Sequence, residues 1–410
     1  MQVYKQLYCR SFQTAFKIAI PFLPYRKPVL IDSLKKLPDI IRKEHAQRVL
    51  LVTDKGIRKA KLDEQILDIL MENGIDVTIY DKTQPNPTIR NIEEGAAIYQ
   101  LMHCQLLIAL GGGSAMDCAK GIGARIARPK KPIPKMKGIL KVLKPIPPLI
   151  AIPTTAGTGS ECTLAAVISD PTKQEKYPIN DFVLIPRYAL LDPQMTVSLP
   201  PFLTATTGLD ALTHAVEAYI GRSSTKDTRQ ESLQAIALIF ANLTTAYDHP
   251  QDLTARKNMA NAAYLAGLAF TKSYVGYVHA IAHSLGGFYR IAHGHANAVI
   301  LPIMLKAYGP SIYQKLKQCA IAAGIADNKT PAKEAAESFI GAIDQLNKRF
   351  AIPTTFQQIK IEDIPAMSRH ADKEANPLYP VPVLKDAKEL EPYYYQLINQ
   401  EVNYGSPSNS

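Results

Sequence analysis

The first half of the chain alternates strand-like and helix-like patterns, and this alternation limits the possible folds more than any other feature. Four apolar runs of strand length indicate buried strands: 48–53, 75–80, 106–110 and 149–152. Helical periodicity occupies 61–73 and 88–101 between them. Strands that alternate with helices form right-handed βαβ units, whose strands pair in parallel. We therefore predict an α/β domain with a parallel sheet over residues 25–200.

The second half has a different character, because helical patterns dominate it. Three long segments with helical periodicity predict helices: 227–247, 253–270 and 331–349. The Ser198-Leu-Pro-Pro201 segment is a natural break before them. We expect an all-α domain over 201–402. Residues 1–24 are expected to form an N-terminal extension, and residues 403–410 a flexible tail.

The composition excludes several classes of protein. Hydrophobic residues make up 47% and charged residues 20%, which is typical of a soluble globular chain and not of a disordered one. No apolar run reaches the ~18 residues of a membrane-spanning helix, so we expect no membrane span. The five cysteines include no CxxC pair and are too few for a disulfide framework, which favours a reducing, cytoplasmic setting.

The net charge of +11 permits an anionic partner. Part of this charge is local, because 128–144 holds seven basic residues and no acid. Its prolines are typical of a loop, and no aromatic residues are interleaved with the charges as in single-strand nucleic-acid binding surfaces. We interpret 128–144 as a solvated basic loop and expect no nucleic-acid partner. A non-enzymatic binding protein that uses this loop is the rival from another functional class.

The N-terminal 31 residues carry five basic side chains and no acid. This composition resembles that of a transit peptide. A secretory signal is not indicated, because Lys17 interrupts the apolar stretch and no small-residue cleavage site follows. We favour a short amphipathic extension that packs on the body of the protein.

A glycine turn, Gly111-Gly-Gly-Ser114, directly follows the predicted strand at 106–110 and opens a helix. Such a turn lets backbone N–H groups approach a phosphate, and the helix dipole favours the anion. The spacing is neither that of the usual dinucleotide fingerprint nor that of a P-loop. Ser114 and Asp117 also have the spacing of a capping box, which would explain both residues without a ligand.

A second polar loop begins where the strand at 149–152 ends. Thr154, Thr155 and Thr158 could hydrogen-bond phosphate or ribose oxygens there, and the glycines between them allow close approach. A tight turn without a ligand is the alternative interpretation of this loop.

Asp54 directly follows the strand at 48–53. A carboxylate at this position can accept hydrogen bonds from both hydroxyls of an adenosine ribose and repel a 2′-phosphate. It precedes the glycine turn, whereas the usual acid follows the glycines by about 20 residues. An ordinary turn or helix-cap residue is therefore the alternative interpretation.

Polar pairs with helical spacing occur twice in the second half. Asp210 and His214 are four residues apart, as are His279 and His283, and each pair therefore shares a helix face. His293 follows after a glycine-containing turn. Two helices that each offer a polar pair can build a metal site, and three imidazoles with one carboxylate suit Zn²⁺, Fe²⁺ or Ni²⁺. Hydrogen-bonded core histidines are the alternative.

Together these segments resemble the iron-containing (group III) alcohol dehydrogenase family. The resemblance runs from about Tyr25 to about Leu397. It rests on six segments in the family's order and spacing: Val52-Thr-Asp-Lys55, Pro85-Asn-Pro-Thr88, Gly111-Gly-Gly-Ser114, Ile152-Pro-Thr-Thr-Ala-Gly-Thr158, Gly208-Leu-Asp-Ala-Leu-Thr-His214 and Val278 to Gly294. It implies a dehydroquinate synthase-like architecture, with an N-terminal nucleotide-binding α/β domain and a C-terminal helical domain.

The resemblance also implies roles for individual residues. The family's ligands for a divalent metal, Fe²⁺ or alternatively Zn²⁺, fall on Asp210, His214, His279 and His293. The catalytic histidine beside the nicotinamide falls on His283. The NAD-binding positions fall on Asp54, Gly112, Gly113, Ser114, Thr154, Thr155 and Lys176.

The reaction that the resemblance implies is metal-assisted hydride transfer between NAD(H) and a small primary alcohol or diol, or the corresponding aldehyde. A homodimer or larger homo-oligomer is expected. The rivals are a polyol oxidation like that of glycerol dehydrogenase and a lyase like dehydroquinate synthase. The lyase needs several basic residues around a polyanionic substrate, whereas 205–220 and 271–285 carry only Lys272.

Overall fold

The computed structural model of the protein describes residues 1–172 and 175–398, so the predicted tail at 403–410 lies outside the described residues. The chain divides into two compact units. The sheet unit comprises residues 22–215 and 230–272, and the helical unit comprises residues 1–21, residues 216–229 and the chain from Ser273 onward. The division falls within α7 (Pro201–Ile220), α8 (Lys226–Asp248) and the last turn of α9 (Leu253–Ser273). The predicted domain boundaries stay predictions.

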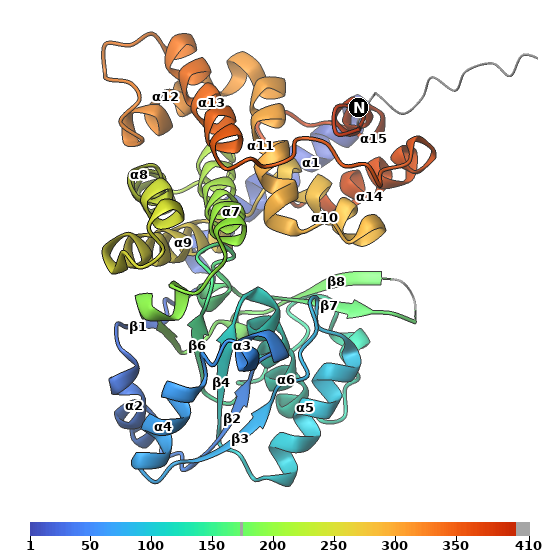
Figure 1. Cartoon of the computed structure of the whole chain (residues 1–410). Coiled ribbons are helices and arrows are strands. Elements are labelled where there is room, and N and C mark those ends of the chain that lie inside the picture. The colour runs from blue at the N-terminus through green and yellow to red at the C-terminus, as the bar shows by residue number, and fades with distance from the viewer. Residues whose placement is uncertain (173–174, 399–410) are drawn as a thin grey trace, which may run out of the picture. The chain divides into compact units, whose positions relative to one another are not determined.

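The sheet unit contains a six-stranded sheet (Figure 1). In spatial order, its strands are β1 (Val29–Ile31), β9 (Tyr188–Leu190), β6 (Leu149–Pro153), β4 (Leu106–Gly111), β2 (Arg48–Val52) and β3 (Asp76–Tyr80). Every neighbouring pair of strands is parallel, which confirms the predicted sheet. The short strands β1 and β9 are additions that the sequence analysis did not predict.

Alternate residues of the central strands face two different helical layers (Figure 1). Leu50 and Val52 of β2 belong to the core on one face, whereas Val49 and Leu51 belong to the core on the other. Both faces of the sheet are therefore buried, and for this reason the strands form continuous apolar runs in the sequence. The helices packed on these faces are α2 (Leu37–Lys43) and α4 (Glu64–Glu72) on one side and α5 (Ile89–Leu101) and α6 (Gly113–Ala127) on the other.

A second, smaller sheet was not predicted. Its strands, in order, are β5 (Gly138–Ile139), β8 (Glu175–Asn180) and β7 (Ala165–Asp170). β5 lies within the basic segment 128–144, which we expected to be a loop. The Asp181 carboxylate also accepts hydrogen bonds from the backbone N–H groups of Val142 and Leu143, both at 2.9 Å. Part of this segment is ordered because its partners come from a distant part of the chain.

The second half of the chain is helical, as predicted. In addition to α7, α8 and α9, the helices of this half are α10 (Tyr277–Tyr289), α11 (His293–Tyr308), α12 (Tyr313–Ala322), α13 (Ala332–Arg349), α14 (Ile364–Ala375) and α15 (Ala387–Tyr395). The first half also contains α1 (Val3–Ala19) and α3 (Lys55–Lys59). The three helices predicted in this half correspond to α8, α9 and α13.

Among the residues that the structure describes, no helix is long and apolar enough to cross a bilayer. All five cysteines lie in the described part of the chain, where they are buried and form no disulfide.

Two glycines let the loop after β6 pack directly on α9. Gly159, in this loop, has a φ of 61°, a left-handed conformation that costs glycine little. Gly267 faces it from the middle of α9. A Cβ atom added to Gly267 would lie 2.5 Å from the Cys162 sulfur and 2.9 Å from the Gly159 carbonyl oxygen. The contact therefore has no room for a side chain at either glycine.

We expect Gly267→Ala to destabilise the protein, although alanine is the better helix former. The added methyl group would meet backbone atoms and a buried sulfur, and overpacking of this kind typically costs about 1–3 kcal/mol. The matched control is Gly341→Ala in α13, where a Cβ atom would meet nothing within 4 Å and the gain should approach ~1 kcal/mol. Thermal unfolding of both variants measures the difference. Equal midpoints for the two variants would contradict the packing argument.

Candidate active site

Three loops that carry predicted site residues begin at the carboxyl ends of adjacent parallel strands. Asp54 follows β2, the glycine turn ends β4, and Thr154 follows β6. Gly111 of β4 pairs with Pro153 of β6, and the Thr154 N–H donates to the Gly111 carbonyl at 3.0 Å. The parallel sheet thus brings these loops to one edge, which is where open α/β sheets bind ligands.

The helix after the glycine turn begins without a side-chain cap. Gly111 has a φ of 148°, and Gly112 is the N-cap residue of α6 with no capping side chain. The alternative interpretation of Ser114 and Asp117 as a capping box is therefore wrong. The Asp117 carboxylate instead accepts hydrogen bonds from the Ser160 hydroxyl at 3.0 Å and from the Val167 N–H at 3.1 Å.

The glycine turn packs against the threonines of the second loop. A Cβ atom on Gly112 would lie 3.5 Å from the Thr155 methyl carbon, and one on Gly113 would lie 3.0 Å from that of Thr158. The Thr155 hydroxyl is buried and makes no hydrogen bond with the described part of the chain. A buried hydroxyl of this kind, beside the backbone of a helix N-terminus, fits a polar ligand better than a turn that only changes the direction of the chain.

Lys120 fastens α6 to the second loop, and the sequence analysis did not single it out. Its buried ammonium group donates to the Ser160 hydroxyl, to both the carbonyl and the hydroxyl of Thr163, and to the Ala165 carbonyl, at 2.9–3.0 Å. Burial lowers the pKa of Lys120 to about 8, although the neighbouring Asp117 opposes this shift. The only signal in the sequence was a lysine among small and apolar residues of α6.

Asp54 is a helix cap, and it also lies where a cofactor-binding carboxylate was predicted. It is the N-cap of α3, because Oδ1 accepts hydrogen bonds from the N–H groups of Gly56 at 2.7 Å and Ile57 at 3.1 Å. Its other oxygen, Oδ2, lies 3.6 Å from the position that a Cβ atom on Gly111 would take. The carboxylate therefore caps a helix and lies beside the glycine turn at the same time.

Asn86 connects two predicted cofactor residues from different elements. Its N–H donates to the Ser114 hydroxyl at 3.2 Å, and its side-chain oxygen accepts a hydrogen bond from the Lys176 ammonium group at 2.6 Å. Asn86 has a φ of 58°, which asparagine tolerates better than most residues. The sequence analysis assigned it no role, although its place between Pro85 and Pro87 is the signal of a special turn.

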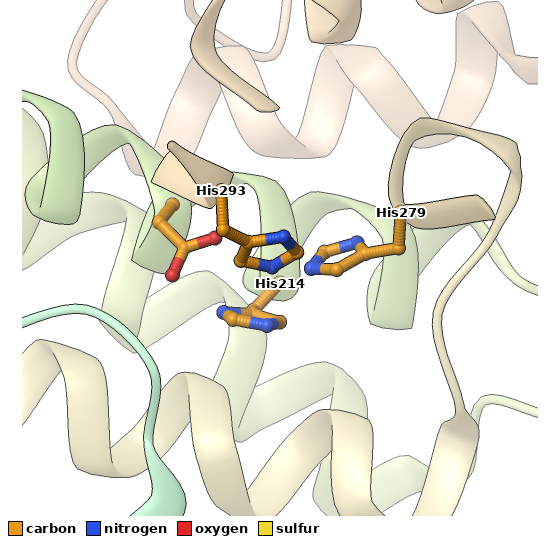
Figure 2. Close-up of side chains that lie close together, drawn as sticks. His214, His279 and His293 are labelled. Atoms are coloured by element: carbon orange, nitrogen blue, oxygen red, sulfur yellow. The ribbon is translucent and has the colours of Figure 1, made fainter. Parts of the chain in front are cut away.

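The four predicted metal ligands converge. Asp210 and His214 lie one turn apart on α7, His279 lies on α10, and His293 is the first residue of α11. One ligand atom of each residue lies within 4.8 Å of the corresponding atoms of the other three, and the three imidazoles point toward one another (Figure 2). Three of the four side chains are buried. This donor set of three nitrogens and one carboxylate fits a divalent first-row metal ion.

A buried glutamate holds one of the imidazoles. Nδ1 of His279 lies 2.6 Å from the Glu217 carboxylate, which also accepts hydrogen bonds from the N–H groups of Gly276 at 2.8 Å and Val278 at 2.9 Å. Burial raises the pKa of Glu217 to about 7, while these N–H donors lower it. With Nδ1 engaged, Nε2 is the ring nitrogen of His279 that can serve as a ligand. It lies 3.3 Å from the side-chain nitrogen of Asn297, which also lies 3.1 Å from Nε2 of His293. Glu217 lies seven residues after Asp210, and this helical spacing was an unused signal.

His283 lies one turn after His279 but outside the ligand cluster. Its Nδ1 lies 2.6 Å from the Glu374 carboxylate, which also accepts a hydrogen bond from the Tyr379 hydroxyl at 2.7 Å. Burial alone would raise the pKa of Glu374, but the adjacent His283 and these hydrogen bonds outweigh it and lower the pKa. The His283 ring stacks on His293, with centroids 5.0 Å apart. The sequence analysis missed both Glu374 and Tyr379.

The family comparison covers most of the chain. The family model described as "Iron-containing alcohol dehydrogenase" matches residues 30–193. The model described as "Fe-containing alcohol dehydrogenase family, C-terminal" matches residues 204–388.

Several curated relatives match over most of their own length. Alcohol dehydrogenase 4 of Saccharomyces cerevisiae is 40% identical and covers 84% of this chain and 89% of its own. The NAD-dependent methanol dehydrogenase of Bacillus methanolicus is 35% identical, with 85% and 92% coverage. Lactaldehyde reductase of Escherichia coli, also 35% identical, has 82% and 88% coverage.

Solved structures agree with the sequence comparison. A crystal structure of 1,3-propanediol oxidoreductase has a TM-score of 0.87 and 36% identity to this chain, covering 91% of this chain and 99% of its own. These relatives do not favour the lyase or the glycerol dehydrogenase-like alternative. The chain belongs to the iron-containing alcohol dehydrogenase family, and it is an alcohol dehydrogenase, as the sequence analysis predicted.

Proposed function

We propose that the protein transfers a hydride between NAD(H) and a small primary alcohol or diol, or the corresponding aldehyde. The observation that carries this proposal is the cluster of Asp210, His214, His279 and His293, which could hold a metal ion, beside a further histidine, His283, outside that cluster. By name, the relatives act on methanol, lactaldehyde and 1,3-propanediol, which are all small and neutral. A neutral substrate also fits 205–220 and 271–285, where Lys272 is the only basic residue.

We infer that Asp210, His214, His279 and His293 hold one divalent metal ion. The family favours Fe²⁺, and Zn²⁺ is the alternative because it accepts the same donors. A bound divalent ion supplies Lewis-acid polarisation of the substrate oxygen. Glu217 would fix the ring of His279, as carboxylates that hold the far nitrogen of a metal-binding histidine commonly do.

The cofactor site that we propose lies along the carboxyl ends of β2, β4 and β6. Backbone N–H groups of Gly112, Gly113 and Ser114 would receive the pyrophosphate at the start of α6. Thr154 and Thr155 would bind phosphate or ribose oxygens. The unpaired Thr155 hydroxyl and its contact with the glycine turn support this assignment.

Asp54 and Lys176 would complete the cofactor site. Asp54 uses Oδ1 to cap α3, which leaves Oδ2 to accept hydrogen bonds from the hydroxyls of the adenosine ribose. Lys176, through Asn86, lies beside Ser114, where its positive charge would favour the pyrophosphate.

His283 would move the alcohol proton toward solvent or toward a ribose hydroxyl. Its side chain is 29% exposed, whereas that of His279 is 2% exposed, so His283 is the one that can exchange protons with water. Glu374 would orient the ring through Nδ1 and leave Nε2 for proton transfer. Tyr379 would in turn hold Glu374.

We also infer the setting of the enzyme. Five buried thiols without a disulfide fit a reducing cytoplasm. Family membership supports a homodimer or a larger homo-oligomer.

The first functional prediction concerns the metal. His279→Ala should lose the bound metal and the NADH-dependent reduction of small aldehydes. The fold should be retained, because the proposed role of the ion is to polarise the substrate oxygen and not to stabilise the core. Elemental analysis, circular dichroism and an aldehyde panel measure the three properties. The control is His103→Ala, at an exposed turn position, which should keep its metal. Full metal occupancy in His279→Ala would refute the ligand assignment.

A second prediction separates His283 from the ligands. His283→Ala should keep its metal and lose ~10²–10⁴-fold in turnover, the usual contribution of a general acid–base group. Glu374→Gln should lower kcat less, with little change in KM for the aldehyde, because it disturbs the orientation of the ring and not the binding of substrate. Steady-state kinetics and metal content test both variants. Metal loss in His283→Ala would make His283 a ligand.

The third prediction concerns cofactor choice. The wild-type protein should prefer NADH over NADPH by at least about tenfold, because Asp54 would face the 2′-phosphate as a like charge. Asp54→Ser should narrow this ratio without weakening α3, since serine caps helices about as well as aspartate. Asp54→Gly should narrow the ratio equally. The ratio of kcat/KM values decides: if it is unchanged in both variants, Asp54 is a cap residue only.

A further inference from the structure

The N-terminal helix α1 attaches to the helical unit through a face that carries both polar and apolar side chains. The Arg10 guanidinium donates to the carbonyl oxygens of Val381 at 2.7 Å and Pro382 at 2.9 Å. The Gln13 amide is buried and donates to the Tyr379 carbonyl at 2.8 Å. These bonds confirm the expected packing of the extension on the body of the protein. Apolar side chains also contribute to this contact: Cys9 and Ile20 are buried, and the Phe16 ring packs edge-on against Tyr274 with centroids 5.1 Å apart.

The opposite side of α1 is apolar and exposed. Its six exposed large apolar side chains are Val3, Tyr4, Leu7, Tyr8, Phe12 and Ile18. Leu7 and Ile18 remain 69% and 66% exposed. The first five recur at intervals of three and four residues from Val3 to Phe12. Ile18 follows Phe12 by six residues and falls on the same side of a helix with about 3.6 residues per turn, so the six form one stripe. A contiguous exposed patch of this kind marks an interaction surface.

Basic side chains border this stripe. On a helix with about 3.6 residues per turn, Lys5 falls at one border and Arg10 and Lys17 at the other. α1 contains no acidic residue. The charge of Lys17 acts on Lys315, whose pKa is lowered to about 8 by burial and then by Lys17 and the nearby Arg229.

The acid beside Lys5 is already paired with it, because the Asp372 carboxylate lies 2.9 Å from the Lys5 ammonium group. Asp372 compensates Lys5, whereas Arg10 donates to neutral amide and carbonyl oxygens. A second copy of the chain on this face would bring two sets of Arg10 and Lys17 side chains together, which is unfavourable. An anionic lipid surface would instead complement the basic borders and accept the apolar stripe.

We propose that α1 is an interfacial helix that docks the enzyme on membrane surfaces rich in anionic phospholipid. The apolar stripe, with the aromatic rings of Tyr4, Tyr8 and Phe12, would enter the boundary between headgroups and acyl chains, where such rings are favoured. Lys17 and its basic neighbours would lie at the level of the headgroups. The helix would lie on the bilayer without crossing it. This role is independent of the hydride transfer proposed above.

Flotation of the full-length holoenzyme with vesicles tests the proposal. The wild-type protein should bind vesicles of phosphatidylcholine and phosphatidylglycerol, bind pure phosphatidylcholine vesicles more weakly, and dissociate as salt is raised. Leu7→Ser combined with Ile18→Ser should weaken partitioning at least about tenfold, since two large apolar side chains no longer enter the interface. Lys17→Glu should weaken binding to the anionic vesicles only.

The matched control is Met71→Ser combined with Leu101→Ser. These side chains, on α4 and α5, are 71% and 75% exposed and lie outside α1, so vesicle binding should be unchanged. NADH turnover in solution should be the same in all variants, which shows that each has folded. The proposal is overturned if the wild-type protein does not float with anionic vesicles, or if the control loses as much binding as the α1 variant. A smaller oligomer for the α1 variant in light scattering, with no vesicle binding by the wild type, would assign the face to a second copy.

Discussion

In a parallel sheet every strand ends at the same edge, and the nucleotide site that we propose depends on that constraint. The strands β2, β4 and β6 deliver an acid, a glycine turn and a threonine loop to adjacent positions. Two further contacts hold the loop that follows β6. The buried ammonium group of Lys120 makes four hydrogen bonds to this threonine loop and the residues after it. The close contact of Gly159 with Gly267 packs the same loop against α9. The loops are therefore held in place before any ligand binds.

The parts of the fold that the sequence analysis predicted correctly are those with a strong local pattern. β2, β4 and β6 are buried on both faces, so each forms an apolar run that needs no knowledge of its neighbours. β1 and β9 are only three residues long, and β1 is mostly exposed, so neither leaves such a run. β5 is a two-residue strand in a proline-rich, basic segment, and only its pairing with β8 and the hydrogen bonds of Asp181 make it regular. Tertiary partners decide such elements.

The same difference applies to the site. Residues on one helix face can be paired from spacing alone, and the pairs Asp210 with His214 and His279 with His283 were visible in this way. Glu374 was not, because it reaches His283 from 91 residues away. The capping box considered for Ser114 and Asp117 is absent for a related reason. The Asp117 carboxylate accepts hydrogen bonds from Ser160 and Val167, which lie far from it in the sequence. Spacing identifies candidates, and only the folded chain shows which partner each one takes.

One helix, α10, carries two histidines that the structure treats differently. Both have Nδ1 at 2.6 Å from a glutamate, so a carboxylate holds each ring through the same nitrogen. Glu217 is buried among backbone N–H donors, and burial raises its pKa. A charged Glu217 paired with a protonated His279 is therefore disfavoured. Glu374 has its pKa lowered and lies beside the more exposed ring. This contrast fits the roles that we propose, in which the buried His279 binds the metal ion and the more exposed His283 transfers the proton.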